Sequence, residues 1–241
     1  MNPHPIQEVQ PRPQTSPPNF DRLAGIYRWL EWLTFGPLLS LCRRAYLDRL
    51  SDHLRALIFG DGDGRFTAAL LRTNPQIRIE AVDASPAMLS QLVRRAGSHA
   101  DRVKICSTDA RAWNPSRPEY DLVVSHFFLD CLSTEEIASL AAGVRACVLP
   151  NAEWVVSEFA VPPGFYGKFA ARPLIAFLYY AFGWLTGLQI RSLPNYRAAL
   201  GQAGFRLTRQ RHFLGGLLVA EAWSPDKSES TPSGSSPVDL H

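Results

Sequence analysis

A glycine-rich turn at positions 60–64 is the part of the sequence best suited to bind a ligand. The apolar residues 56–59 precede it, and residues 67–71 after it begin a helical pattern. Gly60, Gly62 and Gly64 would let the backbone turn sharply and let a ligand approach without Cβ atoms in the way. A buried strand, a glycine turn and a helix form the usual cradle for a nucleotide-like cofactor. The chemistry therefore depends on which cofactor this cradle holds.

Two other ligands fit the turn less well. The nicotinamide fingerprint Gly-x-Gly-x-x-Gly has Arg65 in place of its third glycine, so a nicotinamide-dependent oxidoreductase is a less favoured alternative. A calcium loop would need carboxylates where the sequence has Arg65 and Arg72, which excludes an EF-hand. The four cysteines are far apart and form no CxxC or Cys/His cluster, so we expect no metal site.

The elements around the turn alternate between strand and helix. The patterns predict strands at 57–59, 77–82, 103–106, 122–125 and 154–157. They predict helices at 65–72, at 86–95, and from a capping box at Ser133 and Glu136 to about residue 148. After a helix at 195–203, strands at 206–213 and 217–223 flank a glycine pair and predict an antiparallel hairpin. Together they predict an α/β fold, a Rossmann-like doubly wound, mostly parallel seven-stranded sheet that ends in this C-terminal hairpin.

The two ends of the sequence differ from its body. Residues 1–19 are rich in proline and residues 224–241 in serine and proline, so both are expected to be a disordered arm and tail. The folded domain is expected at 20–223. Its N-terminal part, 20–50, contains helices at 21–35 and 37–50, the second with an apolar stripe that includes Leu38, Leu41 and Ala45. The first twenty residues lack the apolar core of a secretory signal, so we expect a cytoplasmic protein.

At this point the sequence resembles the class I S-adenosylmethionine-dependent methyltransferases, over residues 20–223. Residues 60–64 look like the first motif of that family, and Asp83 ends the second strand nineteen positions after Gly64. The resemblance implies that S-adenosylmethionine is the cofactor and that Gly60, Asp61, Gly62 and Gly64 bind it. A carboxylate at position 83 would accept hydrogen bonds from the ribose hydroxyls.

Further motifs follow in the order of the family. The stretch from Ala84 to Met88 matches the residues after the ribose-binding acid, where Ala84 would contact the cofactor and Met88 would pack on the adenine. By the same resemblance, Asp109 would accept a hydrogen bond from the adenine amino group, with the Ala110 amide beside it. Tyr27 lies in a segment similar to one that closes over the cofactor in small-molecule methyltransferases, including the quinone-biosynthesis C-methyltransferases. Simple packing of its helix is the alternative role for Tyr27.

The fourth strand ends in Ser125 and His126, where family members meet the methionine part of the cofactor and the substrate. Ser125 is therefore a predicted cofactor residue and His126 a predicted catalytic residue. An unperturbed histidine pKa of ~6.5 suits a general base. A structural or substrate-orienting histidine is the alternative, because many methyltransferases work mainly by positioning.

The sequence departs from the family at Ile58. Two positions before the first glycine, the family usually has an acidic residue that helps to hold the ammonium group of the cofactor. Asp61 or Asp63 could replace that acid. The alternative is that both are ordinary residues of a solvent-exposed turn, where aspartate is common. The departure at Ile58 also keeps open a non-catalytic relative that binds the cofactor or serves as a partner subunit.

Residues 173–190 carry no charge over eighteen positions. They lie within 161–193, where this fold usually inserts a substrate lid, and a membrane span there would split the sheet across a bilayer. We expect a buried lid or homodimer face, or else a contact with a membrane surface or lipophilic substrate. The phenylalanine, tyrosine and tryptophan residues of this segment suit an aromatic or lipophilic acceptor.

Nucleic acid is a disfavoured partner. The formal net charge is only +3. The residues after the fourth strand, 125–128, lack the Pro-Pro run that amino-methylating DNA enzymes share, and Arg206, Arg209 and Arg211 fit a solvated sheet edge. The sequence thus predicts methyl transfer from S-adenosylmethionine to a small acceptor.

Overall fold

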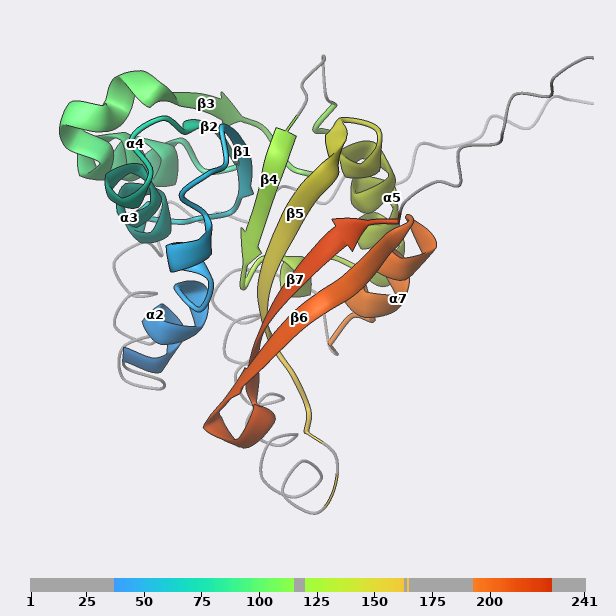
Figure 1. Cartoon of the computed structure of the whole chain (residues 1–241). Coiled ribbons are helices and arrows are strands. Elements are labelled where there is room, and N and C mark those ends of the chain that lie inside the picture. Colours follow the sequence, from blue (N-terminus) through green and yellow to red (C-terminus); the bar gives the residue numbers. More distant parts are fainter. Residues whose placement is uncertain (1–36, 115–119, 163, 165–192, 227–241) are drawn as a thin grey trace, which may run out of the picture.

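The computed structural model describes residues 37–114, 120–162, 164 and 193–226. In this part of the chain a seven-stranded sheet has the order β3-β2-β1-β4-β5-β7-β6 (Figure 1). Its strands are β1 (Arg55–Phe59), β2 (Arg78–Asp83), β3 (Val103–Ser107), β4 (Tyr120–His126), β5 (Val148–Phe159), β6 (Phe205–Phe213) and β7 (Leu218–Pro225). β7 pairs antiparallel with β5 and β6, and the other neighbours pair in parallel. This confirms the predicted fold class.

Helices cover both faces of the sheet, with α3 and α4 on one side and α5 and α7 on the other (Figure 1). The helices are α2 (Pro37–Arg43), α3 (Arg65–Thr73), α4 (Pro86–Ala96), α5 (Thr134–Arg145) and α7 (Tyr196–Gln202). Short 3-10 helices occur at η2 (Leu47–Arg49), η3 (Gly97–Arg102), η4 (Leu129–Cys131) and η6 (Leu214–Gly216). Two apolar clusters fill the layers, one on each face, because both faces of a parallel sheet must be covered.

The central position of β1 fixes where a ligand would bind. β1 lies between β2 and β4, and residues 56–59 are fully buried because both faces are packed. The strand order reverses direction between β1 and β4. Open α/β sheets bind ligands at such a switch point, beyond the carboxyl ends of the strands. The glycine turn follows β1 at this edge.

Some predicted boundaries are wrong. The helix expected at 37–50 ends at Arg43, and Leu41 of its predicted apolar stripe is 55% exposed. After Arg43 the chain turns, and the Tyr46 hydroxyl donates a hydrogen bond to the Ala220 carbonyl of β7 (3.3 Å). These two residues are 174 positions apart, so no local pattern could predict where the helix ends. β5 begins at Val148 rather than at 154, and β7 continues to Pro225, past the expected start of the tail.

Several expectations fall on other parts of the chain. The arm at 1–19, the helix at 21–35, the apolar segment 173–190 and the tail beyond residue 226 lie outside the described residues. Within the described ranges, no helix has the length and apolar character needed to cross a bilayer.

Candidate cofactor and acceptor site

The glycine loop between β1 and α3 has one glycine that faces open space. Gly60, Gly62 and Gly64 all have positive φ angles, of 62°, 58° and 79°. A Cβ on Gly64 would meet the Leu92 backbone at 2.6 Å, so this glycine allows α3 and α4 to pack closely. A Cβ on Gly60 would overlap the ring of Phe128, whereas one on Gly62 would have no atom of the described residues within 4 Å. The open backbone at Gly62 is what close approach of a cofactor requires, so the cradle fits such a ligand.

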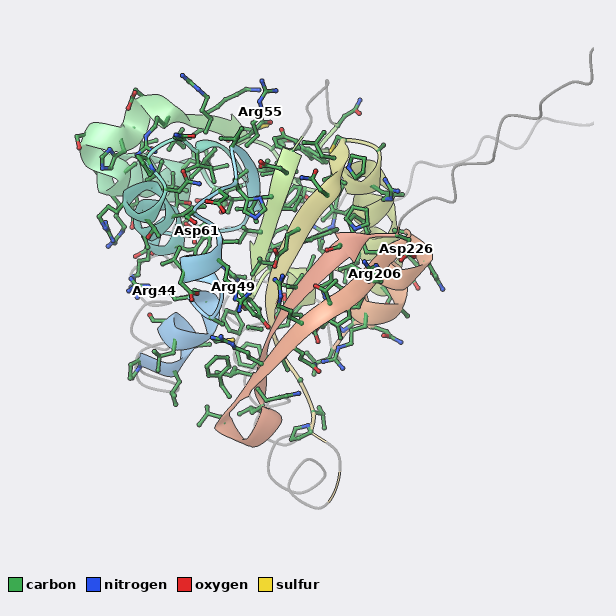
Figure 2. All side chains as sticks on the ribbon, in the orientation of Figure 1. Arg44, Arg49, Arg55, Asp61, Arg206 and Asp226 are labelled. Atoms are coloured by element: carbon green, nitrogen blue, oxygen red, sulfur yellow. The ribbon has the colours of Figure 1, made fainter. Side chains whose placement is uncertain are left out.

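The two acids of this loop have different surroundings. Asp61, labelled on the loop in Figure 2, accepts a hydrogen bond from the Thr67 amide near the start of α3 (Oδ2 to N, 2.8 Å). Burial raises the pKa of Asp61 to about 6, although the Thr67 bonds and the charge of Arg43 lower it. Asp63 is paired with two guanidinium groups, those of Arg65 (3.0 Å) and Arg95 (2.8 Å). Asp61 is therefore the better placed of the two to meet a ligand cation.

Asp83 ends β2 beside the loop. Its Oδ1 accepts a hydrogen bond from the Ser85 amide (2.8 Å), and Ser85 in turn caps α4 by accepting from the Met88 amide (3.2 Å). Ala84 is exposed and Met88 is half-buried. The Gly60 amide donates to the Val82 carbonyl (3.0 Å), which ties the glycine loop to this end of β2. The structure thus places the predicted ribose and adenine residues of β2 and α4 at the same edge as the loop.

Asp109 follows β3 and forms an ion pair with Arg111 (Oδ2 to Nη1, 3.1 Å). Arg111 also bonds Glu136 at the start of α5 (2.6 Å). Ala110 is buried in the cluster under α5. The carboxylate of Asp109 thus has a protein partner, and the adenine contacts expected of Asp109 and Ala110 stay predictions.

The end of β4 places Ser125 and His126 on opposite faces of the sheet. The Ser125 hydroxyl is buried and accepts a hydrogen bond from the Trp154 indole (3.0 Å), so it faces the core. His126 is 4% exposed, packs edge-on against Phe66, and neither of its ring nitrogens has a hydrogen-bond partner among the described residues. Burial, assisted by the charge of Arg43, lowers the pKa of His126 to about 3. A neutral imidazole that binds protons this weakly is better suited to orienting a ligand than to abstracting a proton.

Sequence reasoning missed Glu158, at the end of β5. Its side chain is 1% exposed, and Oε1 accepts hydrogen bonds from the Phe128 amide (3.1 Å) and the Leu129 amide (2.8 Å). Its Oε2 has no partner in the described part of the chain. Burial and the charge of Asp130 raise the pKa of Glu158 well above its usual range, against the backbone hydrogen bonds, which lower it. The available signal was an acid directly after the predicted strand 154–157.

The turn after β4 is strained. Phe127 has a φ of 52°, in the left-handed region that non-glycine residues rarely adopt. Its ring packs against Phe159 (centroids 5.2 Å apart), and the Arg43 guanidinium lies 5.2 Å from its centroid. The hydrogen bonds that Glu158 accepts from the Phe128 and Leu129 amides hold this turn in place. The strained residue, the buried acid and His126 therefore lie at the same end of the sheet. Tyr27, predicted to close over the cofactor, lies outside the described residues.

Comparison with known proteins agrees with this geometry. A sequence model described as "Methyltransferase domain" matches residues 56–151, from β1 into β5. A curated relative, the malonyl-[acyl-carrier protein] O-methyltransferase of Paenibacillus sp. (strain JDR-2), is 28% identical over 159 residues, which cover 63% of this chain and 55% of that protein.

Solved structures share the fold. The mitomycin 7-O-methyltransferase MmcR has a TM-score of 0.65 at 14% identity, over 86% of this chain and 60% of that one. The S-adenosylmethionine-dependent methyltransferase SibL has a TM-score of 0.62 at 20% identity, over 89% of this chain and 64% of that one. The chain thus spans between half and two thirds of the length of each of these proteins.

Proposed function

We propose that this chain carries a class I methyltransferase domain, as the match of residues 56–151 to a methyltransferase model supports, and that it transfers a methyl group from S-adenosylmethionine to a small acceptor. The observation that carries the proposal is the open backbone at Gly62, in a loop whose Gly60 amide is bonded to the Val82 carbonyl next to Asp83, at the switch point between β1 and β4. The cofactor would supply an electrophilic methyl group, which leaves positioning to the protein.

The residues at the switch point suit the parts of such a cofactor. Asp83 would accept the ribose hydroxyl hydrogens, and Met88 would cover the adenine. Asp61 would face the ammonium group, because Asp63 is already neutralised by two arginines. The remaining proposed cofactor contacts are Tyr27, Gly60, Gly64, Ala84, Asp109, Ala110 and Ser125.

An oxygen atom of a lipophilic or aromatic acceptor is the methylation target that we propose. Three features support it: the names of the O-methyltransferase neighbours, the aromatic ring of Phe127, and the ring nitrogens of His126, which have no partner among the described residues. A neutral His126 offers one N–H donor and one acceptor nitrogen, which would orient the acceptor oxygen toward the methyl group. Membrane contact or a homodimer through 173–190, and the absence of nucleic acid, stay predictions, as does a cytoplasmic location.

A non-catalytic cofactor-binding protein is the second candidate. Ile58 favours it, because this buried side chain stands where the family usually has an acid that holds the cofactor. Weak binding of the cofactor, or binding without turnover, would follow from that loss.

Calorimetric titration with S-adenosylmethionine and S-adenosylhomocysteine tests both candidates. Micromolar binding, followed by release of S-adenosylhomocysteine with a panel of phenols and carboxylic acids, is the expected result. Binding without turnover on any acceptor would favour the second candidate. No binding of either compound would contradict the proposed function.

A further inference from the structure

The turn that follows β4 is held by two consecutive residues of β5. The Ser157 carbonyl accepts a hydrogen bond from the Phe127 amide (2.7 Å), and Oε1 of Glu158 accepts from the Phe128 amide (3.1 Å) and the Leu129 amide (2.8 Å). Leu129 is fully buried, so its amide cannot turn to solvent for a partner. All three amides of this turn therefore depend on acceptors from the neighbouring strand.

The backbone of the turn needs this support. Phe127 has a φ of 52°, and a non-glycine residue keeps such a conformation only where its surroundings impose it. The Cys131 amide bonds the Phe128 carbonyl (3.0 Å), so η4 starts from the same turn. Loss of the Glu158 oxygen would leave the Phe128 and Leu129 amides without their acceptor, and the turn would be free to relax.

The turn reaches the cofactor loop through the ring of Phe128. This ring stacks on Phe59 at the end of β1 (centroids 5.9 Å apart), and it covers Gly60 so closely that a Cβ there would overlap it. Gly60 has a positive φ, and its amide bonds the Val82 carbonyl (3.0 Å). Because β4 lies between β1 and β5 in the sheet, the ring can carry the influence of Glu158 across one strand.

We propose that Glu158 is a positioning residue for the cofactor loop: by fixing the Phe128 backbone, it keeps the ring against Gly60 and preorganises the loop for its ligand. The inference rests on the proposed function and deepens it, because it names a residue outside the loop that sets cofactor affinity. A preorganised loop binds more tightly, since less ordering remains to be done when the ligand arrives. In this arrangement the effect of Glu158 passes through Phe128.

Substitutions at Glu158 test the hydrogen bonds themselves. E158M removes the acceptor at a similar side-chain length. We expect it to weaken S-adenosylhomocysteine binding at least fivefold in calorimetry, and to speed hydrogen exchange of the amides at 60–64 in the ligand-free protein. E158Q keeps Oε1 for the two amides, and its NH₂ group replaces Oε2, which has no partner among the described residues. E158Q should therefore stay within threefold of the unaltered affinity, and a loss as large as that of E158M would overturn the inference. If E158M does not fold, E158D withdraws the same oxygen by one methylene and takes its place.

A double-mutant cycle with Phe128 tests the route. F128L removes the ring and leaves the backbone amide that bonds Glu158, so it should reproduce the loss seen in E158M. The double variant F128L/E158M should lose little more than either single variant. Additive losses would overturn the inference, because Glu158 would then act on the loop by another path.

The matched control is E221Q, at a second buried acid on the adjacent strand. Glu221 lies two positions from Val219, the residue opposite Glu158 in the pairing of β5 with β7, but its hydrogen bonds go to side chains of α7, β6 and β7. E221Q should destabilise the hairpin and yet change neither the S-adenosylhomocysteine affinity nor the exchange at 60–64. Equal effects of E158M and E221Q on the loop would overturn the inference, since they would reflect a general loss of stability. If the unaltered chain bound no S-adenosylhomocysteine, the proposed function would be refuted, while the ligand-free exchange would still decide whether Glu158 positions the loop.

Discussion

Phe128 lies directly on the backbone of Gly60, so that the ring from the turn after β4 covers the first glycine of the loop after β1. This contact joins the cofactor half of the sheet to the half that would bind the acceptor. Phe128 also stacks on Phe59 of β1 (centroids 5.9 Å apart). Position 60 thus needs a glycine because Phe128 packs against its backbone. Position 62 has no such neighbour among the described residues, and its glycine leaves the backbone open to a ligand.

Gly60→Ala should therefore destabilise the fold more than Gly62→Ala. Both changes place a Cβ at positive φ, which costs roughly 1–2 kcal/mol. Gly60→Ala adds the overlap with Phe128, and overpacking of this kind costs about 1–3 kcal/mol more. Urea unfolding of the two variants measures the difference, and equal losses would contradict the packing role of Gly60. Gly62→Ala should instead lower S-adenosylhomocysteine affinity.

Asp83→Asn should weaken S-adenosylhomocysteine binding about tenfold or more while leaving the protein folded. The amide keeps an oxygen for the Ser85 amide but loses the charge, and hydrogen bonds to charged groups contribute about 1.5–3 kcal/mol. Calorimetry measures the affinity. Asp121→Asn is the control: Asp121 accepts bonds from the Leu54 and Arg55 amides at the start of β1, at the opposite end of the strands from the glycine loop, so binding should not change. Unchanged binding in Asp83→Asn would refute the ribose assignment.

His126 should make the fold sensitive to acid. Its pKa is about 3 in the folded protein against 6.5 unperturbed, so the unfolded chain binds the extra proton between these values. Stability contributed by this group is full above pH 6.5 and falls as the pH is lowered toward 3, by about 1.36 kcal/mol per pH unit. The His126→Leu variant lacks this pH-dependent contribution to the free energy of unfolding. Between pH 7.5 and 5.0 the unaltered chain should lose about 2 kcal/mol more than the variant in urea unfolding, and parallel losses would show that His126 is not buried in neutral form.

Glu221→Gln should destabilise the C-terminal hairpin by about 3 kcal/mol, because it breaks a buried ionic cluster. The carboxylate of this β7 residue is fully buried and accepts hydrogen bonds from Tyr196 (3.1 Å), Gln210 (2.8 Å) and Trp223 (3.0 Å), besides its ion pair with Arg197. An amide would turn N–H groups toward these donors. Hydrogen exchange of the β6 and β7 amides measures the effect. Glu153→Gln, whose ion pair with the exposed Arg209 lies at the surface, is the control and should change stability by less than about 1 kcal/mol.

The sequence was sufficient where a local pattern decides the structure. The capping box of Ser133 and Glu136, the proline in the first turn of α4 and the fully apolar β1 all led to elements at the expected places. The fold class followed from their alternation. The position of Asp83 at the end of β2 also followed, since it depends on strand length alone.

Features that depend on distant contacts could not be predicted. Asp63 is neutralised by Arg95, thirty-two residues away, and α2 ends early because the following chain docks on β7. The surroundings of Glu158 and Arg43 depend on the pairing of β4 with β5 and on the docking of α2. No local sequence pattern predicts these distant contacts, whereas the glycine turn can be recognised from its own five residues.

The docking of α2 on β5 and β7 also has a thermodynamic consequence. Through Cys42, the end of α2 is fixed to strands on the side of the switch point proposed to bind the acceptor. If an acceptor shifts those strands and changes cofactor affinity by some factor, the cofactor must change acceptor affinity by the same factor. The size of this mutual effect would be a coupling energy that β5, β7 and the short helix α2 transmit.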